Sequence, residues 1–299
     1  MARIEGITMK LIAHIRGPSK FDMDPAAYQR LSHELGQPNA HQLMAEISTT
    51  DHDYQRFLTI LEDHGFSRWP GSCPRDDKTH YVLTIRRSYS EPDLDDAELL
   101  LALGGDPSFC YASKRDPAGQ IVMPVEPGVT PNSAENAIVG SIVRWLFANE
   151  SVCSTLEEAR ICGLTFEASR PVRLEDQDRA ERDPSVPSYP GQVWSRLGSS
   201  IRLPPTAPSM GRVDCFTKEP VPRDYAKQML LLDADDPAIQ NAQLRYLRSE
   251  LEPVAGFDVA EMSERFSAGH ELIVSQRFRH VCIEHDINCR FEPIVIEDP

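Results

Sequence analysis

Residues Ile273–Asp298 read IVSQRFRHVCIEHDINCRFEPIVIED, and they predict a helix followed by a strand. The apolar positions i, i+4, i+7 and i+8 mark one helix face, formed by Val274, Phe278, Val281 and Cys282. Asn288 is typical of a helix end, and the apolar residues around Pro293 predict a strand over Phe291–Ile296.

A fainter copy of this unit lies upstream, over Leu156–Asp176 (LEEARICGLTFEASRPVRLED). It also reads as a charged helical piece, a stop at Gly163 and a strand. The endings resemble each other, Pro171–Asp176 against Pro293–Asp298. The pair predicts a duplicated building block and points to no particular reaction.

Composition indicates a globular protein, because 40% of the 299 residues are apolar and 26% are charged. No stretch approaches the roughly 20 apolar residues that span a bilayer. Charged residues interrupt every apolar run of the opening residues, so no signal-peptide core is expected there. Seven scattered cysteines without a CxxC pair favour reduced thiols. We therefore expect a cytoplasmic protein with no membrane partner.

The formal net charge of −15 argues against nucleic acid as a partner. Affinity for a phosphate backbone depends on lysine and arginine that release counterions, and no basic cluster occurs in this chain. An acidic surface fits a basic protein partner.

The alternation of segments predicts an α+β fold of mixed α/β layers, with antiparallel or mixed sheets and the two related helix–strand units. Strands are expected over Ile7–Ile15, His41–Thr49 and Tyr81–Ile85, and helices over Pro25–Leu35, from Thr50 or Asp51 to Gly65, and over Leu94–Leu103. A hairpin is expected where Phe109–Ala112 and Gln120–Val125 flank the turn Arg115–Gly119. A capping pair, Asn132 and Glu135, predicts a long helix with Ile138, Ile142, Trp145 and Leu146 on its buried face.

Three parts are expected from this pattern. Residues 1–176 form an N-terminal α/β half, and 177–190, charged and Pro-rich, form an interdomain linker or a long surface loop. Residues 191–299 form a helix-rich half that ends in the helix–strand unit. Within that half, short strands are expected over Val193–Leu203 and Val213–Thr217, one helix behind Pro237 with Leu244, Leu247 and Leu251, and another capped by Asp258 with Val259, Met262 and Phe266.

One cluster near the end has the residue types of a zinc site: His280, Cys282, His285 and Cys289. On a helical wheel His280 points away from the others, so at most three ligands converge. A buried cysteine beside a histidine accounts for the pattern better, and we assign no metal or cofactor. Whether Cys282, His285 and Cys289 bind a metal stays open at this point.

Two acidic clusters, Asp93–Asp96 and Asp233–Asp236, resemble one another. Such carboxylates suit magnesium, calcium or general acid–base chemistry, but both precede expected helices, where capping explains them. Ser199 and Ser141 lack the flanking pattern of a nucleophile elbow. His270-Glu271 lacks a second histidine at position 274, which is valine. No catalytic residue is assigned.

Two patterns resemble immunity-protein-like families of bacterial polymorphic toxin systems, including the double-CXXCG-motif proteins. One is Arg87-Ser-Tyr89 leading into Asp93-Leu94 and Ala97-Glu98-Leu99-Leu100; the other is the ending from Val274-Ser275 to Ile296. The paired cysteines of the double-CXXCG group are absent, and Cys73 stands alone. The resemblance implies a non-enzymatic, cytoplasmic, acidic protein that binds and blocks a partner.

The leading hypothesis is therefore a protein-binding protein, most concretely an immunity protein that neutralises a basic toxin domain. The alternative is a cytoplasmic hydrolase or metal-dependent enzyme, with Cys282, His285, Asp235 and Asp236 as the first positions to examine. A third is a scaffold with neither activity nor toxin partner. The sequence leaves the partner and the oligomeric state open.

Overall fold

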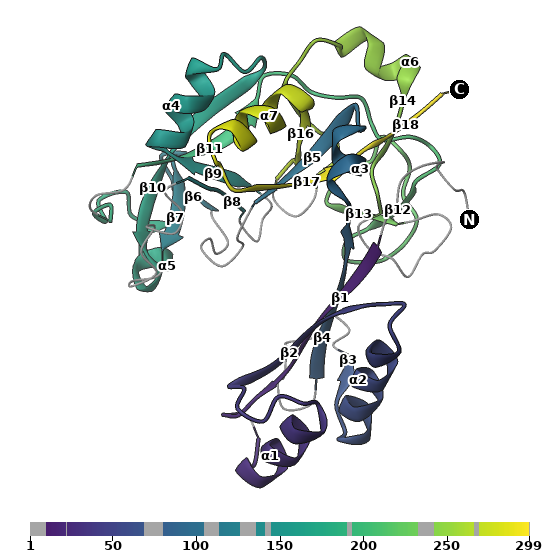
Figure 1. Ribbon diagram of the computed structural model, residues 1–299. Coiled ribbons are helices and arrows are strands. Elements are labelled where there is room, and N and C mark those ends of the chain that lie inside the picture. The colour runs from purple at the N-terminus through teal and green to yellow at the C-terminus, as the bar shows by residue number, and fades with distance from the viewer. Residues whose placement is uncertain are drawn as a thin grey trace. The chain divides into compact units, whose positions relative to one another are not determined.

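The computed structural model describes residues 10–21, 23–68, 80–104, 114–125, 136–140, 145–189, 193–232, 242–265 and 269–298 (Figure 1). The chain divides into two compact units, residues 2–90 and 91–299, and each is described by itself. Both contain helices, and the sheets are antiparallel or mixed, so the expected α+β class is confirmed.

The N-terminal unit is a four-stranded sheet with two helices on one face. Its elements are β1 (Lys10–Ser19), α1 (Pro25–Glu34), β2 (Gln42–Ser48), α2 (His52–Asp63), β3 (Ser67–Arg68) and β4 (His80–Ser88). The strand order is β2-β1-β4-β3, so β2 forms an edge among the described strands. Alternate residues of β1 and β2, such as Ile15 and Leu43, are buried against Leu31 of α1 and Leu61 of α2.

Local signals set both helices of this unit as expected. The Asp24 carboxylate accepts from the backbone N–H groups of Ala26 and Ala27 at the start of α1, and Asp51 caps α2 in the same way. Gly36 (φ 69°) and Gly65 (φ 85°) follow the helix ends in the left-handed conformation that glycine adopts most easily. Of the first expected strand, residues 7–9 lie outside the described residues.

The larger unit is rich in strands. Its elements are α3 (Glu91–Asp95), β5 (Leu99–Gly104), β6 (Lys114–Arg115), β7 (Ile121–Val125), β8 (Ile138–Gly140), β9 (Leu146–Asn149), α4 (Glu150–Glu158), β10 (Leu164–Arg173), α5 (Gln177–Ala180), β11 (Trp194–Ser199), β12 (Gly211–Asp214), β13 (Met229–Leu232), β14 (Arg245–Leu247), α6 (Arg248–Leu251), β15 (Val259–Glu261), β16 (Leu272–Ser275), α7 (Gln276–Glu284), β17 (Cys289–Pro293) and β18 (Val295–Glu297). Two main sheets have the orders β6-β7-β10-β11-β9-β8 and β15-β16-β5-β17, and two further pairs are β12-β13 and β14-β18.

A strand–helix–strand unit occurs twice, as β9-α4-β10 and as β16-α7-β17. Strand β9 begins at Leu146 and β16 at Leu272, 126 positions later, and the helices that follow begin 126 positions apart as well. Asn149 and Ser275, at equivalent positions, cap the two helices through their side chains. Beyond each helix, Arg160 and Asp286 share a φ of 52°. The expected pair of related helix–strand units is confirmed.

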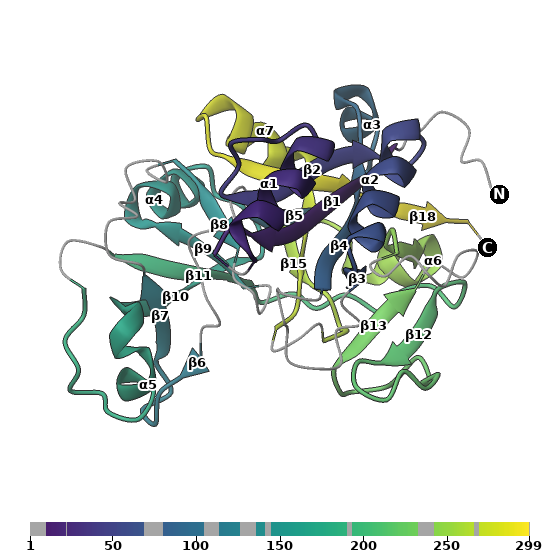
Figure 2. The same cartoon turned by 90° about the horizontal axis from the view of Figure 1, so that it is seen from below.

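The equivalence extends to whole sheets, because β8-β9-β11-β10 matches β15-β16-β5-β17 strand by strand, all antiparallel. A parallel strand, β7, flanks the first set beside β10, and a parallel pair, β14-β18, follows β17 of the second set in the chain as a separate sheet. In chain order β5–β10 form one half and β11–β18 the other. Each half therefore contributes its first strand, β5 or β11, to the sheet of the other half (Figures 1 and 2).

Two hydrogen bonds at equivalent positions join the halves. The Ile138 N–H donates to the Asn288 carbonyl, and the Val259 N–H donates to the Cys162 carbonyl, both at 3.0 Å. The expected match of Pro171 with Pro293 is wrong, because these residues are 122 positions apart and the equivalent elements are 126 positions apart. Pro171 pairs with Met123 of β7, whereas Pro293 pairs with Leu100 of β5.

The division of the chain differs from the three expected parts. The chain divides after Ser90, and both related halves lie within residues 91–299. Residues 177–190 were expected to separate domains, but they connect β10 and β11, which are neighbours in one sheet. Ala180 and Val186 of this segment are buried against Val122 and Val172. Burial of these side chains makes the segment part of the core of the larger unit.

Several expected helices are strands instead. Leu94–Leu103 contains β5, the interior strand between β16 and β17; Ile138 lies in β8 and Leu146 in β9; Val259 lies in β15; and of the Leu244–Leu251 segment only α6 is helical. A strand buried on both faces is apolar throughout and loses the alternation that identifies strands, so a helical spacing can be read into it. The expected signals at 109–112, 132, 135, 142, 237 and 266 lie outside the described residues.

Within the described part of the chain, no helix is long and apolar enough to cross a bilayer.

Candidate binding groove

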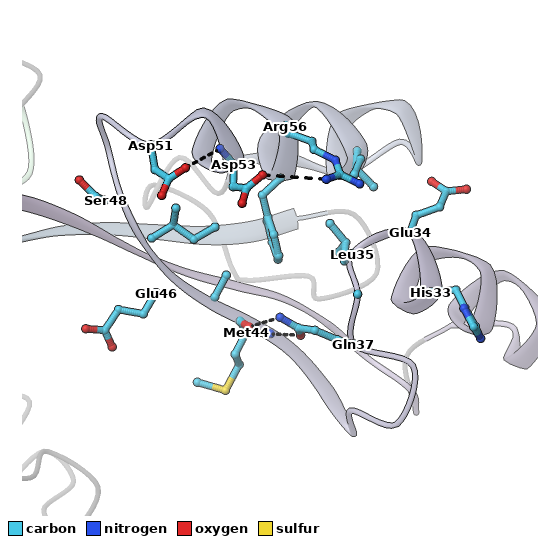
Figure 3. Close-up of a pocket in the computed structure, with 15 residues that line it drawn as sticks. His33, Glu34, Leu35, Gln37, Met44, Glu46, Ser48, Asp51, Asp53 and Arg56 are labelled. Carbon is cyan, nitrogen blue, oxygen red and sulfur yellow. Dashed lines mark hydrogen bonds and ion pairs between the residues drawn. The ribbon is translucent and has the colours of Figure 1, made fainter.

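An open groove of about 650 Å³ lies on the N-terminal unit, beside the edge strand β2 (Figure 3). Three consecutive segments line it: the end of α1 with the turn that follows, the middle of β2, and the first half of α2. The lining residues are His33, Glu34, Leu35, Gly36, Gln37, Met44, Ala45, Glu46, Ile47, Ser48, Asp51, Asp53, Arg56, Phe57 and Ile60.

The turn after α1 brings a side chain onto β2. With Gly36 in the left-handed conformation, the Gln37 N–H donates to the Ser32 carbonyl at 2.7 Å, which closes the helix end. The Gln37 amide then reaches the strand: its Nε2 donates to the Met44 carbonyl at 2.5 Å, and the Met44 N–H donates to its Oε1 at 3.1 Å (Figure 3). One side chain thus satisfies both backbone groups of Met44.

The floor of the groove is apolar, because it is the outer layer of the core of this unit. Five side chains form it: Leu35, Ala45, Ile47, Phe57 and Ile60. The Phe57 side chain is buried, and the other four are partly exposed. A partly exposed apolar floor beneath a polar rim is the arrangement that interfaces use for anchoring side chains.

The rim is acidic. Among the described residues that line it, four are acidic, Glu34, Glu46, Asp51 and Asp53, and one is an arginine, Arg56. The Glu46 side chain lies on the face of β2 opposite Ala45 and Ile47, beside His14. Asp53 lies 3.9 Å from Arg56, and both side chains are more than half exposed, so this pair is weak. The nearest partners of Glu34 and Glu46 are the histidines His64, at 3.0 Å, and His14, at 3.7 Å. The groove therefore presents a negative potential.

The two units differ in charge. Residues 2–90 contain eleven Lys and Arg against eleven Asp and Glu, whereas residues 91–299 contain 20 against 35. All of the net charge of −15 thus belongs to the larger unit. The acidity of the groove is local to its rim, and a long-range negative field comes from residues 91–299.

The zinc-like cluster is dispersed in the structure. Cys282 is buried in α7, and burial raises the pKa of its thiol to about 12. The Cys289 thiol donates to the Leu103 carbonyl at 3.3 Å, and burial raises its pKa well above the ordinary value. His280 and His285 are exposed. Among the described residues, no three His, Cys, Asp or Glu side chains gather closely enough to hold a metal ion.

Asp93–Asp96 do not precede a long helix as expected. Asp93 is buried within the short helix α3, and Asp95 accepts from the buried Arg279 of α7 at 2.5 Å. The cluster fastens α3 to α7 instead of capping a helix. Asp233–Asp236, which include the candidates Asp235 and Asp236, lie outside the described residues, as does Ser141.

Ser199 and His270 both make internal hydrogen bonds. Ser199 Oγ lies 2.8 Å from the carbonyl oxygens of Gly163, in the first half of the larger unit, and Val259, in the second, and accepts from the Ile201 N–H. His270 Nδ1 lies 2.9 Å from the Glu264 carbonyl oxygen, and its Nε2 lies 3.3 Å from Arg202. Burial and then Arg202 lower the pKa of His270.

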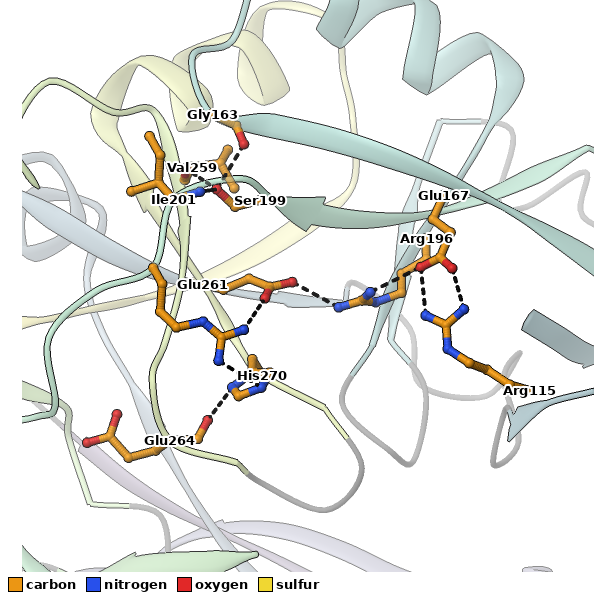
Figure 4. Close-up of polar contacts among 11 residues, drawn as sticks. Arg115, Gly163, Glu167, Arg196, Ser199, Ile201, Val259, Glu261, Glu264 and His270 are labelled. Carbon is orange, nitrogen blue, oxygen red and sulfur yellow. Dashed lines mark hydrogen bonds and ion pairs between the residues drawn. The ribbon is translucent and has the colours of Figure 1, made fainter. Parts of the chain in front are cut away.

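A line of alternating charges connects the sheets of the larger unit (Figure 4). It runs through Arg115, Glu167, Arg196, Glu261 and Arg202, with Arg196 3.2 Å from Glu167 and 2.9 Å from Glu261. The hydrogen bond from Arg115 lowers the pKa of Glu167. Arg196 also lies over the Trp145 ring, 5.2 Å from its centroid. Each charge faces an opposite one, so the line serves as an internal tie.

Sequence reasoning found neither the groove nor this line of charges. The only signals for the groove were the helix stop at Gly36 and the cap at Asp51, which fix two of its walls without showing that they meet. Comparison with protein-family models, with curated proteins and with solved structures finds no match to this chain.

Proposed function

We propose that this protein is a non-enzymatic binding protein whose groove takes a basic segment of a partner protein. In its most concrete form, the proposal is a bacterial immunity protein that neutralises a toxin in the cytoplasm. One observation carries it: the described lining of an open groove with an apolar floor includes four acidic residues and one arginine.

The chemistry of the groove supports a peptide segment as the ligand. An apolar floor accepts aliphatic stems, and carboxylates at the rim accept the charged ends of lysine and arginine, whose side chains combine both features. The 35 acidic residues of the larger unit add a field that attracts a basic partner from a distance.

The hydrolase alternative gains no support from the residues that first suggested it. The thiolate is the reactive and metal-binding form of cysteine, and a pKa of about 12 keeps Cys282 protonated at neutral pH. His285 follows the last residue of α7 and is exposed. We therefore do not propose a reaction.

The test is quantitative binding of the full-length chain to a candidate partner, a basic toxin domain encoded beside it. Charge reversal at the rim, Glu46→Lys with Asp53→Lys, should weaken binding by tenfold or more, because two attractive contacts become repulsive. The matched control is Asp63→Lys, an exposed acidic residue of α2 that does not line the groove. Equal affinity of the rim variant and the control would contradict the proposal.

Neutralisation itself is tested by growth. Cells that express the toxin domain should survive with the wild-type chain and die with the rim variant, provided that both chains accumulate to the same level. If cells die with the wild-type chain as well as with the rim variant, despite tight binding in vitro, the protein binds the toxin domain without inhibiting it. The immunity assignment would then be wrong.

A further inference from the structure

On the outer edge of strand β2, the backbone N–H and C=O of Met44 are hydrogen-bonded, and those of Glu46 are open. In an antiparallel pair, successive residues of a strand direct their backbone groups alternately toward and away from the neighbouring strand. Met44 directs its N–H and C=O away from β1, because both bond to the Gln37 side chain. Glu46, two residues later, directs its groups the same way.

The far end of this edge is closed again. The Ser48 carbonyl accepts from the Asp51 N–H at 2.9 Å as the chain turns into α2. Between these two closures lie the N–H and C=O of Glu46, and within the described part of the unit no strand flanks β2 on this side. The open stretch lines the groove.

The Gln37 amide offers β2 the same hydrogen-bonding groups as a peptide group of a flanking strand. It offers one donor and one acceptor to a single residue, in the arrangement that a flanking strand offers to a hydrogen-bonded pair. Such protection of an edge is expected, because exposed edges pair readily with other chains. A side chain is easily displaced, and a displaced glutamine recovers its hydrogen bonds from water.

Building on the proposed function, we propose that the basic segment binds as an extended strand added to the edge of β2. It pairs with the backbone of Glu46 and, by displacing the Gln37 amide, with the backbone of Met44. Alternate side chains of the added strand face the apolar floor and the acidic rim, as the two-residue period of a strand requires. The occupant is an extended segment of a basic protein partner.

The first experiment uses the full-length chain and a fluorescent twelve-residue peptide of alternating lysine and valine, with binding followed by anisotropy. The comparison peptides replace lysine with glutamate, or carry a methyl group on every second backbone nitrogen, in either phase. The lysine peptide should bind, and the glutamate peptide should not. One methylated phase should bind about tenfold more weakly, because it loses the N–H groups that face β2.

The second experiment separates backbone from charge at one residue. Glu46→Pro removes an N–H that faces away from β1, so the sheet tolerates the change as edge strands do. Glu46→Gln removes the charge and keeps the N–H. Glu46→Pro should weaken binding by at least fivefold relative to Glu46→Gln, and unchanged far-ultraviolet circular dichroism should show that both variants fold.

Gln37→Ala frees the backbone groups of Met44 and should tighten binding severalfold. Hydrogen exchange of the Glu46 and Ser48 amides should slow when the lysine peptide is bound. If the lysine peptide binds but methylation, Glu46→Pro and Gln37→Ala all leave affinity unchanged, strand addition is wrong and the basic-segment proposal stands. If the lysine and glutamate peptides bind equally or not at all, the proposed function itself fails.

Discussion

Gly104 on β5 and Gly140 on β8 meet where the two main sheets of the larger unit approach each other, and their surroundings are unequal. A Cβ added to Gly104 would lie 2.0 Å from the backbone nitrogen of Gly140, a distance that only backbone movement relieves. A Cβ added to Gly140 would have no neighbour closer than 3.4 Å, an ordinary contact.

Gly104→Ala should therefore lower the free energy of unfolding by about 3 kcal/mol or more, whereas Gly140→Ala should change it by less than about 1 kcal/mol. Urea denaturation of the two variants measures the difference. Equal destabilisation would show that the strands do not approach each other most closely at Gly104.

His270 predicts a pH dependence of stability. Burial lowers the pKa of its imidazole from the ordinary 6.5, so between the two pKa values the unfolded chain holds more protons than the folded one. Stability is complete above about pH 6.5 and falls as the pH drops toward the folded-state pKa. The melting temperature should fall between pH 7 and pH 5.5 in the wild type.

The slope should be smaller in His270→Gln. His280→Gln, at an exposed position of α7, serves as the control and should keep the wild-type slope. An unchanged slope in His270→Gln would show that other groups cause the acid destabilisation.

At the scale of elements, segments with chemical boundaries were predictable and interior strands were not. Asp24 and Gly36 delimit α1, and Asp51 and Gly65 delimit α2, through interactions within a few residues. Strand β5 has no such signal. Its run of leucines is buried on both faces, inside a sheet whose neighbouring strands β16 and β17 are more than 160 residues away.

The groove was unpredictable for a related reason. The turn after α1 is joined to β2 by the Gln37 amide, which bonds to the backbone of Met44. A glutamine in a loop carries no sequence signal for that contact. The acidic rim residues are spaced irregularly between 34 and 53, and only the packing of α1 and α2 on one face of the sheet brings them together. What could be read from the sequence was the overall acidity.

The segment between β10 and β11 gives an element-scale prediction. The buried Arg170 of β10 donates to the carbonyls of Ala180, Pro184 and Val186 and pairs with Asp116 at 3.0 Å. Arg170→Ala would leave the Asp116 carboxylate buried without its cation, at a cost of about 3–5 kcal/mol. It would also release the segment that contains Arg179 and Arg182.

Limited digestion with trypsin measures this release. Arg170→Ala should be cut at Arg179 or Arg182 at a concentration that leaves the wild type intact. Arg173→Ala, which removes an exposed pair with Glu175 and a contact with the Tyr189 ring but leaves Asp116 paired, should behave as the wild type does. Resistance of the Arg170 variant would mean that the apolar contacts of Ala180 and Val186 hold the segment alone.

At the scale of the whole molecule, the unequal charge of the two units predicts how a partner arrives. The excess of 15 acidic residues lies within 91–299, so it acts mainly through long-range attraction and is screened by salt. For a basic partner, the association rate should fall about tenfold or more between 50 mM and 500 mM sodium chloride, with little change in the dissociation rate. Stopped-flow mixing measures both rates, and a salt-independent association rate would exclude electrostatic steering.

The exchange of the strands β5 and β11 between the two halves determines which parts of the chain can fold first during synthesis on the ribosome. Ala13 of β1 pairs with Ile47 only 34 residues later, so the N-terminal unit can close early, while Leu101 of β5 pairs with Ile273, 172 residues later. At about 5–20 residues per second, β5 leaves the tunnel roughly 10–35 s before its partners exist. Nascent chains should therefore need a chaperone over Leu99–Leu103. The groove of the N-terminal unit forms while the acidic residues of the larger unit are still being translated.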